Sequence, residues 1–521
     1  MTPPPTNRLA LTARLSLAIM PPSKRANAAQ NAHASCASIV VGVTTLIVAH
    51  AHVSRVELKD GGDFVNAAMS LGLMLFAALG AMRRTMRDAS STEVSAFSAY
   101  ATMAPVWALC AVSGTNAGTR LGRATATAFS AAGSVAYVDA WTPSSEKKTF
   151  ISALVWMLAM RLMSGAFAMD AVMVAFARAC AWGLAGAAAP SETTLLSVGA
   201  ASVMEMCVGI YRDVGTRARA SEASALAGAF AIAGVGLLLA SARLVCWPTP
   251  ASKATQFGVL SLALSVPEWF YRVSNPGKSN MILGVVRYTM KTNMETLTSL
   301  TKLWCTGLAV ALGVAYNARA MPLTMRRKAF HFLAIVMFAP TLMPNSGHGE
   351  LIRVAFAVAF ALFACVECAR VFDAYYGHGL FGWKLSVLLA QFVGDGVVSL
   401  IIFDHFSLLL GIAVPVWLSD DPKSLVPWAG VLTLGVGDSF ASIVGGAIGR
   451  RKVFGERSSK TLEGAIAFAV STFVAASYVG ADISASKLAG ACVATALFEL
   501  SVEGVSDNFV LPLYFAALVA P

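Results

Sequence analysis

Long apolar runs separated by short polar segments dominate the chain. They begin with Ile39–Ala49, continue through Phe257–Trp269, and recur almost to the last residue. A helix that crosses a bilayer needs about 20 apolar residues, whereas the strands of a membrane barrel would alternate apolar and polar positions. The pattern therefore predicts an all-α polytopic membrane protein with roughly 13–15 transmembrane helices, at ~35 residues for each span and its loop.

The composition supports this interpretation. Of 521 residues, 57% are hydrophobic and only 13% are charged, about half the charged fraction of roughly 25% in soluble domains. So few charges exclude a soluble multidomain enzyme, a disordered protein and a secreted disulfide scaffold. The net charge of +11 fits cationic loops that stay cytosolic against anionic headgroups, so we expect membrane lipids as partners and no nucleic acid.

Three regions differ in their pattern. Residues 1–38 contain no acidic residue and fit a disordered tail or a cleaved targeting peptide equally well. Residues 39–320 are expected to form an N-terminal transmembrane scaffold or lipid-binding region, ending with an amphipathic stretch, Arg287–Lys302, along the membrane interface. In residues 321–521 the polar residues gather between spans, which predicts a C-terminal catalytic transmembrane domain built as a helical bundle.

The strongest local signal is the segment Leu434–Gly464. An apolar helix carries Asp438 between small residues, and a strongly basic loop follows it, with Lys460 and Glu463 directly before the next apolar run. Cations and hydroxyls can bind a polyphosphate, and carboxylate oxygens are what Mg²⁺ takes alongside phosphates. The simpler alternative is a loop that only follows the positive-inside rule, but a carboxylate within a span is costly and favours a functional site.

Five motifs, in order, resemble the CTP-dependent polyprenol kinases and, among them, the kinases that phosphorylate dolichol. The resemblance covers about Met325 to Leu518, and its motifs are Arg327-Lys328-Ala329-Phe330-His331, His405 with Leu408-Leu409-Leu410-Gly411, VGDSFAS (Val436–Ser442), KTLEG (Lys460–Gly464), and Asp507-Asn508 with Leu511-Pro512-Leu513-Tyr514. The chain departs from the family at Ser459, where the first of two consecutive lysines usually stands. Arg457 is expected to compensate for the missing lysine.

The resemblance implies a multi-pass enzyme of the endoplasmic reticulum membrane. It would transfer the γ-phosphate of CTP to the terminal hydroxyl of dolichol, with a divalent metal, Mg²⁺, as cofactor and a CTP loop at residues 449–463 facing the cytosol. Dolichyl phosphate is a lipid carrier for protein glycosylation. The residues expected to bind CTP are Gly449, Arg450, Arg451, Arg457, Ser458, Ser459, Lys460, Thr461 and Glu463.

Roles can be assigned to the remaining polar residues. Asp438 and Glu463 are the leading metal ligands, Lys460 clamps phosphate, and Asp438, Asp395 or His405 acts as the base. Further candidates are Arg327, Lys328, His331, Glu367, Asp404, Asp507 and Asn508. Several have structural alternatives: Glu367 could pair with Arg370 within a helix, Asp507 or Asn508 could cap one, and the histidines could be structural.

Two other functions remain open at this point. A kinase of a shorter isoprenoid alcohol, phytol or farnesol, shares the C-terminal motifs, and a plastid location would favour phytol. The long N-terminal half favours a longer alcohol, because each buried CH₂ contributes ~0.8 kcal/mol. A transporter would show internal repeats and charges at the midplane, whereas here the charges gather in one loop. The Arg-Lys-x-Phe-His motif argues against a phosphatidate cytidylyltransferase.

Overall fold

The computed structural model describes the C-terminal three-fifths of the chain. It covers isolated helical positions between 196 and 210, and residues 221–520 except 246–252, 278–279, 293, 318–322, 344–348, 377–400, 420, 422, 453–459, 481 and 502–506. The predictions for residues 1–38, and for most of the N-terminal scaffold, lie outside these ranges.

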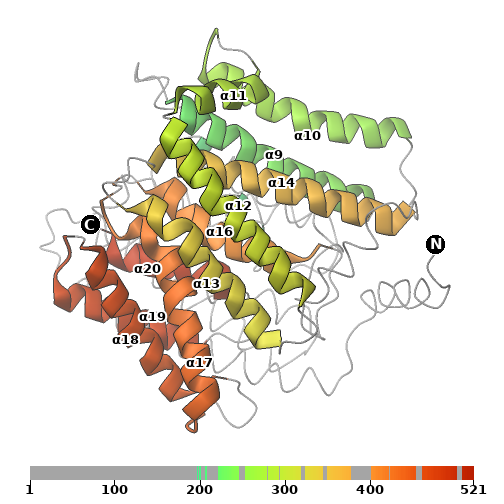
Figure 1. Cartoon of the computed structure of the whole chain (residues 1–521). Coiled ribbons are helices and arrows are strands. Elements are labelled where there is room, and N and C mark those ends of the chain that lie inside the picture. Colours follow the sequence, from blue (N-terminus) through green and yellow to red (C-terminus); the bar gives the residue numbers. More distant parts are fainter. Residues whose placement is uncertain are drawn as a thin grey trace, which may run out of the picture.

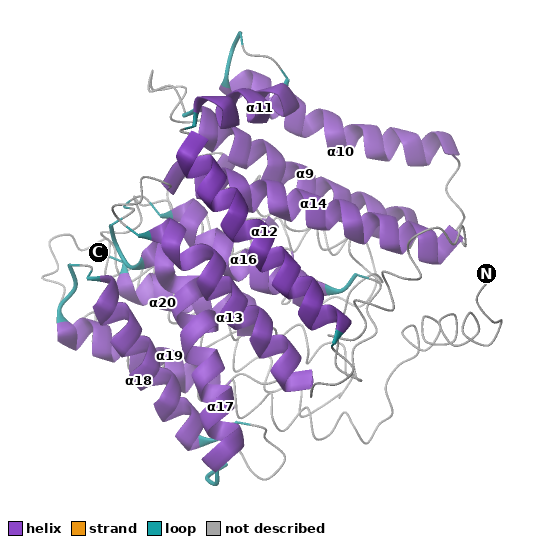
Figure 2. Ribbon diagram, in the orientation of Figure 1, coloured by secondary structure: helices purple, strands orange, loops and turns teal. Residues whose placement is uncertain are grey.

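Every regular element in the described part is a helix, as Figure 2 shows. The helices are α9 (Glu222–Val245), α10 (Lys253–Ser274), α11 (Met281–Lys291), α12 (Met294–Tyr316), α13 (Leu323–Leu342), α14 (Gly349–Tyr376), α16 (Phe403–Leu418), the short η3 (Val426–Trp428), the π-helix η4 (Val431–Asp438), α17 (Ser439–Ile448), α18 (Leu462–Val479), α19 (Ala485–Ser501) and α20 (Asp507–Val519). The all-α prediction is confirmed.

Five of these helical segments are long and apolar enough to cross a membrane. They are Glu222–Ala242, Met294–Val314, Gly349–Phe372, Val431–Ile448 and Leu462–Val479. The shorter apolar helices Phe406–Leu418 and Asp507–Val519 accompany them. A polytopic membrane protein is thus confirmed, while the total of 13–15 spans stays a prediction.

The helices form two adjoining groups (Figure 1). In one, α9 packs against α14, α10 and α11. In the other, η4 packs against α13, α16, α17, α18 and α20, while α16 packs against α20 and α19 packs against α18 and α20. Contact between α14 and α16 joins the groups. Almost every side chain of α20 is buried, so the start of this helix is held rigidly within the second group.

The helix α18 has two distinct faces. Phe468, Thr472 and Ala476 are buried against neighbouring helices, whereas Ile466, Val470 and Val474, also four residues apart, are more than half exposed. Water-exposed faces of helices are normally polar. An exposed face of this kind is typical of contact with lipid.

Close backbone approach at two glycines holds the second group together. A Cβ on Gly411 of α16 would lie 2.0 Å from the carbonyl oxygen of Asn508, at the start of α20. One on Gly437 of η4 would lie 2.5 Å from Thr472 Oγ1 on α18. At Gly411 the neighbour is backbone, so no other residue type fits without displacing a helix, whereas at Gly437 a larger residue would have to displace the Thr472 and Phe468 side chains.

The expectation for Arg287–Lys302 needs a correction. The stretch is not one interfacial helix: α11 ends at Lys291, Thr292 caps it with an extended backbone, and α12 begins at Met294 as part of a candidate span. The apolar residues that follow Lys302 extend α12 far enough to cross a bilayer, so only the segment up to Lys291 keeps the short amphipathic form.

Candidate functional site

The site begins at the last residue of the π-helix η4. In a π-helix the backbone hydrogen bonds span five residues, and such turns occur frequently at functional sites. Here the turn ends at Asp438, which is 6% exposed. Its carboxylate forms an ion pair with the Lys328 ammonium from α13. The two candidate residues therefore meet although they are far apart in the sequence.

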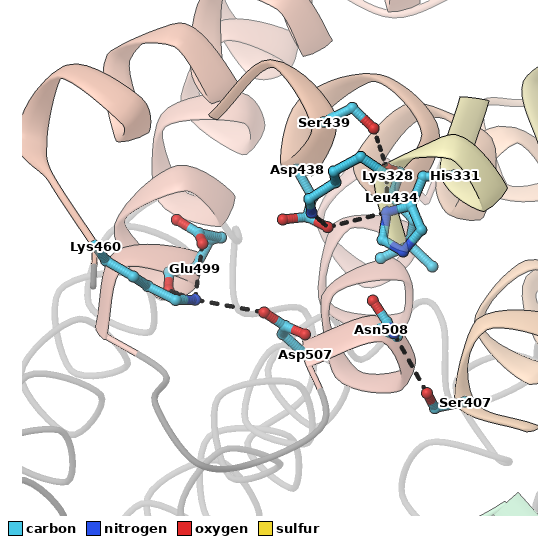
Figure 3. Close-up of polar contacts among 10 residues, drawn as sticks. All are labelled: Lys328, His331, Ser407, Leu434, Asp438, Ser439, Lys460, Glu499, Asp507 and Asn508. Atoms are coloured by element: carbon cyan, nitrogen blue, oxygen red, sulfur yellow. Dashed lines mark hydrogen bonds and ion pairs between the residues drawn. The ribbon is translucent and has the colours of Figure 1, made fainter. Parts of the chain in front are cut away.

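His331, one turn after Lys328 on α13, contacts the same carboxylate. Its Nδ1 lies 3.1 Å from Asp438 Oδ2 and 3.1 Å from the carbonyl oxygen of Leu434 (Figure 3). Both partners are acceptors, so Nδ1 must carry the hydrogen. The ring thus fixes the carboxylate in place and at the same time ties α13 to η4.

Lys460 lies on the other side of the site, directly before α18. Its Nζ is 2.7 Å from Glu499 Oε1, 2.6 Å from the Glu499 carbonyl oxygen and 3.5 Å from Asp507 Oδ2. Burial opposes the charged form of this ammonium, yet the attraction of Glu499 and Asp507 outweighs it and raises the pKa of Lys460 above its ordinary value. Lys460 is therefore a fixed positive charge at neutral pH.

Three carboxylates converge between the two lysines. Asp438, Glu499 and Asp507 each offer one oxygen, and these oxygens lie within 4.8 Å of one another. They come from η4, α19 and α20, three helices that pack around one centre. A group of hard oxygens this compact suits Mg²⁺. It also brings Asp438 and Lys460 into one site, as the sequence interpretation requires.

Asn508 adds a further oxygen beside this group. The residue is 4% exposed, its Nδ2 donates to Ser407 Oγ at 3.4 Å, and its Oδ1 has no hydrogen-bond partner among the described residues. Figure 3 shows that the amide nitrogen points to Ser407 and the oxygen points the other way, towards the side where Asp438 and His331 lie. A buried amide oxygen without a donor is costly, and a cation or substrate donor would satisfy it.

The two described ends of the basic loop, at Arg450–Arg451 and at Thr461–Glu463, are joined by hydrogen bonds. Thr461 caps α18, its Oγ1 accepting from Gly464 N at 3.2 Å. The carboxylate of Glu463 accepts the backbone N–H groups of Arg450 and Arg451 at 3.1 and 3.2 Å. These bonds join the end of α17 to the start of α18.

Glu463 therefore has a different partner set from the one the sequence predicts. We expected it to bind metal with Asp438, but its position in the first turn of α18 directs its carboxylate to two loop N–H groups, and the compact carboxylate group in the described part does not include it. Glu499 stands there instead. Sequence reasoning did not single out Glu499, although a lone carboxylate in the apolar sequence of α19 was the available signal.

The remaining candidates are placed as follows. Glu367 is buried in α14, pairs with Arg370 at 2.7 Å and accepts from the backbone N–H of Ile402 at 2.8 Å, so it supports the start of α16.

Arg327 is exposed on α13. Gly449 ends α17, and Arg450 and Arg451 are exposed. Asp404 and His405 stand in the first turn of α16, where only the backbone is described, and Asp395, Arg457, Ser458 and Ser459 lie outside the described residues.

Fold and site together define a class: a helical membrane protein whose C-terminal bundle holds a largely buried cluster of three carboxylates and two lysines. No protein-family model and no solved structure matches the chain. Curated relatives do match, however.

Several curated relatives are dolichol kinases. The chain is 29% identical to dolichol kinase EVAN of Arabidopsis thaliana over 50% of the chain and 46% of the relative. It is 30% identical to the dolichol kinase of Bos taurus over 50% and 51%, and 29% identical to dolichol kinase sec59 of Schizosaccharomyces pombe over 40% and 41%. The chain thus matches about half the length of these relatives, and they support the resemblance drawn from the motifs.

Proposed function

We propose that this protein is a dolichol kinase that transfers the γ-phosphate of CTP to the terminal hydroxyl of dolichol. The observation that carries the proposal is the convergence of Asp438, Glu499 and Asp507 with Lys328 and Lys460 on one buried site. Phosphoryl transfer needs little more from a protein than positioning and charge stabilisation. The names of the relatives indicate the acceptor, and the motifs indicate the donor.

The polar groups suit this chemistry. Carboxylate oxygens of Asp438, Glu499 and Asp507, with the amide oxygen of Asn508, are the donors that Mg²⁺ prefers, and the ion would neutralise charge on the transferred phosphoryl group. Lys328 and Lys460 supply positive charge for phosphate oxygens. The exposed Arg450 and Arg451 attract the nucleotide to this end of the bundle.

The reaction can be balanced with these groups. The dolichol oxygen forms a bond to the γ-phosphorus while the bond between that phosphorus and the β–γ bridging oxygen breaks, and CDP leaves. The hydroxyl proton passes to a base, for which Asp438 is the candidate inside the described site. His331 donates to Asp438 from Nδ1 and holds the carboxylate in position.

The proposed setting is the endoplasmic reticulum membrane, with the 449–463 loop in the cytosol, where the product would serve glycosylation. The apolar exposed face of α18 supports contact with lipid in this arrangement. The basic residues Arg450, Arg451 and Lys452 favour the cytosolic side for the loop.

The direct test uses membranes that contain the full chain, with CTP labelled in either the α- or the γ-phosphate. Dolichol, phytol and farnesol are offered as acceptors. We expect label from γ-phosphate only, transferred to dolichol in preference to the shorter alcohols. Transfer from the α-phosphate would contradict a kinase, and a preference for phytol or farnesol would assign the protein to the shorter-alcohol kinases.

A further inference from the structure

One ammonium and a divalent cation would compete for the same carboxylates in this site. Lys460 Nζ lies 2.7 Å from Glu499 Oε1 and 3.5 Å from Asp507 Oδ2, and these two residues belong to the carboxylate group suited to a metal. A Mg²⁺ ion binds oxygens at about 2.0–2.1 Å. An ammonium at hydrogen-bonding distance from two of the same carboxylates therefore competes with the ion for them.

The charges lead to the same conclusion. Among the described residues at this centre, three carboxylates carry three negative charges, and Lys328 and Lys460 carry two positive ones. A divalent ion added while both lysines stay in contact would give the centre an excess of positive charge at close range, which disfavours binding. The ion binds favourably once one lysine withdraws. Lys328 stands within the helix α13 and pairs with Asp438, whereas Lys460 stands at the end of a loop.

Asn508 points to a ligand independently of the carboxylates. It is 4% exposed, and within the part of the chain that the structure describes its Oδ1 accepts no hydrogen bond, although its Nδ2 bonds to Ser407. In Figure 3 this oxygen is turned to the side of Asp438. Lys460 does not satisfy it, so the arrangement of donors in the structure leaves one acceptor that a cation would complete.

We propose that Lys460 is an exchangeable counter-ion, which pairs with Glu499 and Asp507 until a divalent cation takes their oxygens and then turns to the triphosphate. The proposal rests on the proposed function for the presence of a triphosphate. A lysine suits this task because its charge is compact and its stem is flexible. The backbone beside it is fixed, because Thr461 caps α18, so the side chain can move while its base stays in place.

The first experiment measures Mn²⁺ binding by the purified full chain, with no nucleotide and no lipid alcohol present. We compare the wild type with Lys460→Met, and use Lys487→Met as the control, since Lys487 bonds to the carbonyl oxygen of Ala520 and not to a carboxylate of the site. Removing the competing charge should tighten Mn²⁺ binding by about tenfold in Lys460→Met. Lys487→Met should bind as the wild type does. Equal or weaker binding by Lys460→Met would overturn the proposal.

The second experiment needs no variant and so does not depend on how a variant folds. The wild-type chain is treated with an amine-specific reagent, and modification of Lys460 and Lys487 is followed by mass spectrometry with and without Mn²⁺. Release from the carboxylates should raise the modification rate of Lys460 several-fold and leave Lys487 unchanged. An unchanged or slower rate at Lys460 would overturn the exchange.

The two proposals fail separately. Both experiments omit CTP and dolichol, so their outcome does not depend on phosphoryl transfer. Missing γ-phosphate transfer would count against the proposed function alone, whereas unchanged Mn²⁺ binding in Lys460→Met would count against the exchange alone.

Discussion

At the scale of single residues, Asp438 connects two groups of charged side chains. It pairs with Lys328 and accepts from His331 on one side, and on the other it belongs to the carboxylate group with Glu499 and Asp507. Replacing it changes both the stability of the bundle and the chemistry of the site. The two effects can be separated, because removing one partner of a buried ion pair is costly while removing both is often tolerated.

We expect Asp438→Asn to lower the rate of phosphoryl transfer by about a hundredfold or more, because a loss of this size is typical when a group that stabilises charge in the transition state is removed. It should also destabilise the protein, since Lys328 loses its partner. The double variant Asp438→Asn with Lys328→Met should regain thermal stability and stay inactive. Asp482→Asn, at an exposed position between α18 and α19, is the control. A double variant that recovers activity would contradict a functional role for Asp438.

The sequence predicts Glu463 as a metal ligand, whereas the structure places Glu499 in the carboxylate group. Variants of the two residues distinguish these alternatives. Glu499→Gln should raise the Mg²⁺ concentration needed for half-maximal transfer by about tenfold, because one hard anionic ligand is lost. Glu463→Gln should leave the Mg²⁺ requirement unchanged and lower thermal stability only, since Glu463 bonds to the N–H groups of Arg450 and Arg451. Titrating Mg²⁺ against transfer in both variants distinguishes them, and the reverse result would restore Glu463 as the ligand.

The sequence predicts those site residues that stand within a recognisable motif. Asp438, Lys460, Lys328 and Asp507 each belong to a motif with a recognisable neighbourhood, and the structure places all four in one cluster. Glu499 has no motif around it. Its role depends on how α19 packs against α18 and α20, a tertiary relation that a single sequence does not encode locally.

At the scale of elements, the contact between α16 and α20 positions the site. Gly411 lets α16 approach the Asn508 carbonyl so closely that a Cβ would lie 2.0 Å from it. Ser407, one turn earlier on α16, holds the Asn508 amide. Asp507 and Asn508 stand on α20, but their position therefore depends on Ser407 and Gly411, which lie one turn apart on α16.

We expect Gly411→Ala to push α20 away from α16, which should lower the melting temperature by several degrees and reduce transfer by about tenfold or more. Gly490→Ala on α19 is the matched control, because nothing lies within 4 Å of its Cβ position and alanine favours a helix. Thermal unfolding and transfer are measured on both variants. Equal behaviour of the two would show that the close contact at Gly411 does not position the site.

Element boundaries could be predicted where apolar runs end in clear polar segments. The run Ala223–Ala242 corresponds to α9, and the apolar segment before the basic loop corresponds to η4 and α17. The break at Thr292 and the π-helix were not predictable, because a local backbone turn and a change in hydrogen-bond spacing leave no trace in the hydrophobic pattern.

At the scale of the whole molecule, the outer surface of the bundle determines how the protein sits in its surroundings. One face of α18 exposes the apolar side chains of Ile466, Val470 and Val474, while its other face carries the packing contacts. The same helix begins at Thr461, next to Lys460. One helix therefore links the polar centre to the surface that we assign to lipid.

Val470→Arg tests this surface. A charge near the middle of a lipid-facing helix costs about 2.5–3.5 kcal/mol, so the yield of folded protein in membranes should fall sharply. Tyr478→Arg is the control: Tyr478 is 84% exposed near the end of the same helix, where a long cationic side chain reaches the interface. Membrane fractionation and size-exclusion profiles report the result. Comparable yields for both variants would show that this face does not contact lipid.

The π-helix makes the hydrogen-bond spacing of the 431–438 segment as important as its composition. An α-helix turns by about 100° per residue, and a π turn holds an extra residue between hydrogen-bonded partners. If the same residues were wound as an ordinary α-helix, that extra residue would carry Asp438 about 100° further around the axis. The carboxylate would then be offset from α13 by roughly a quarter of a turn, so the chain could keep all of its chemical groups and still lose their alignment.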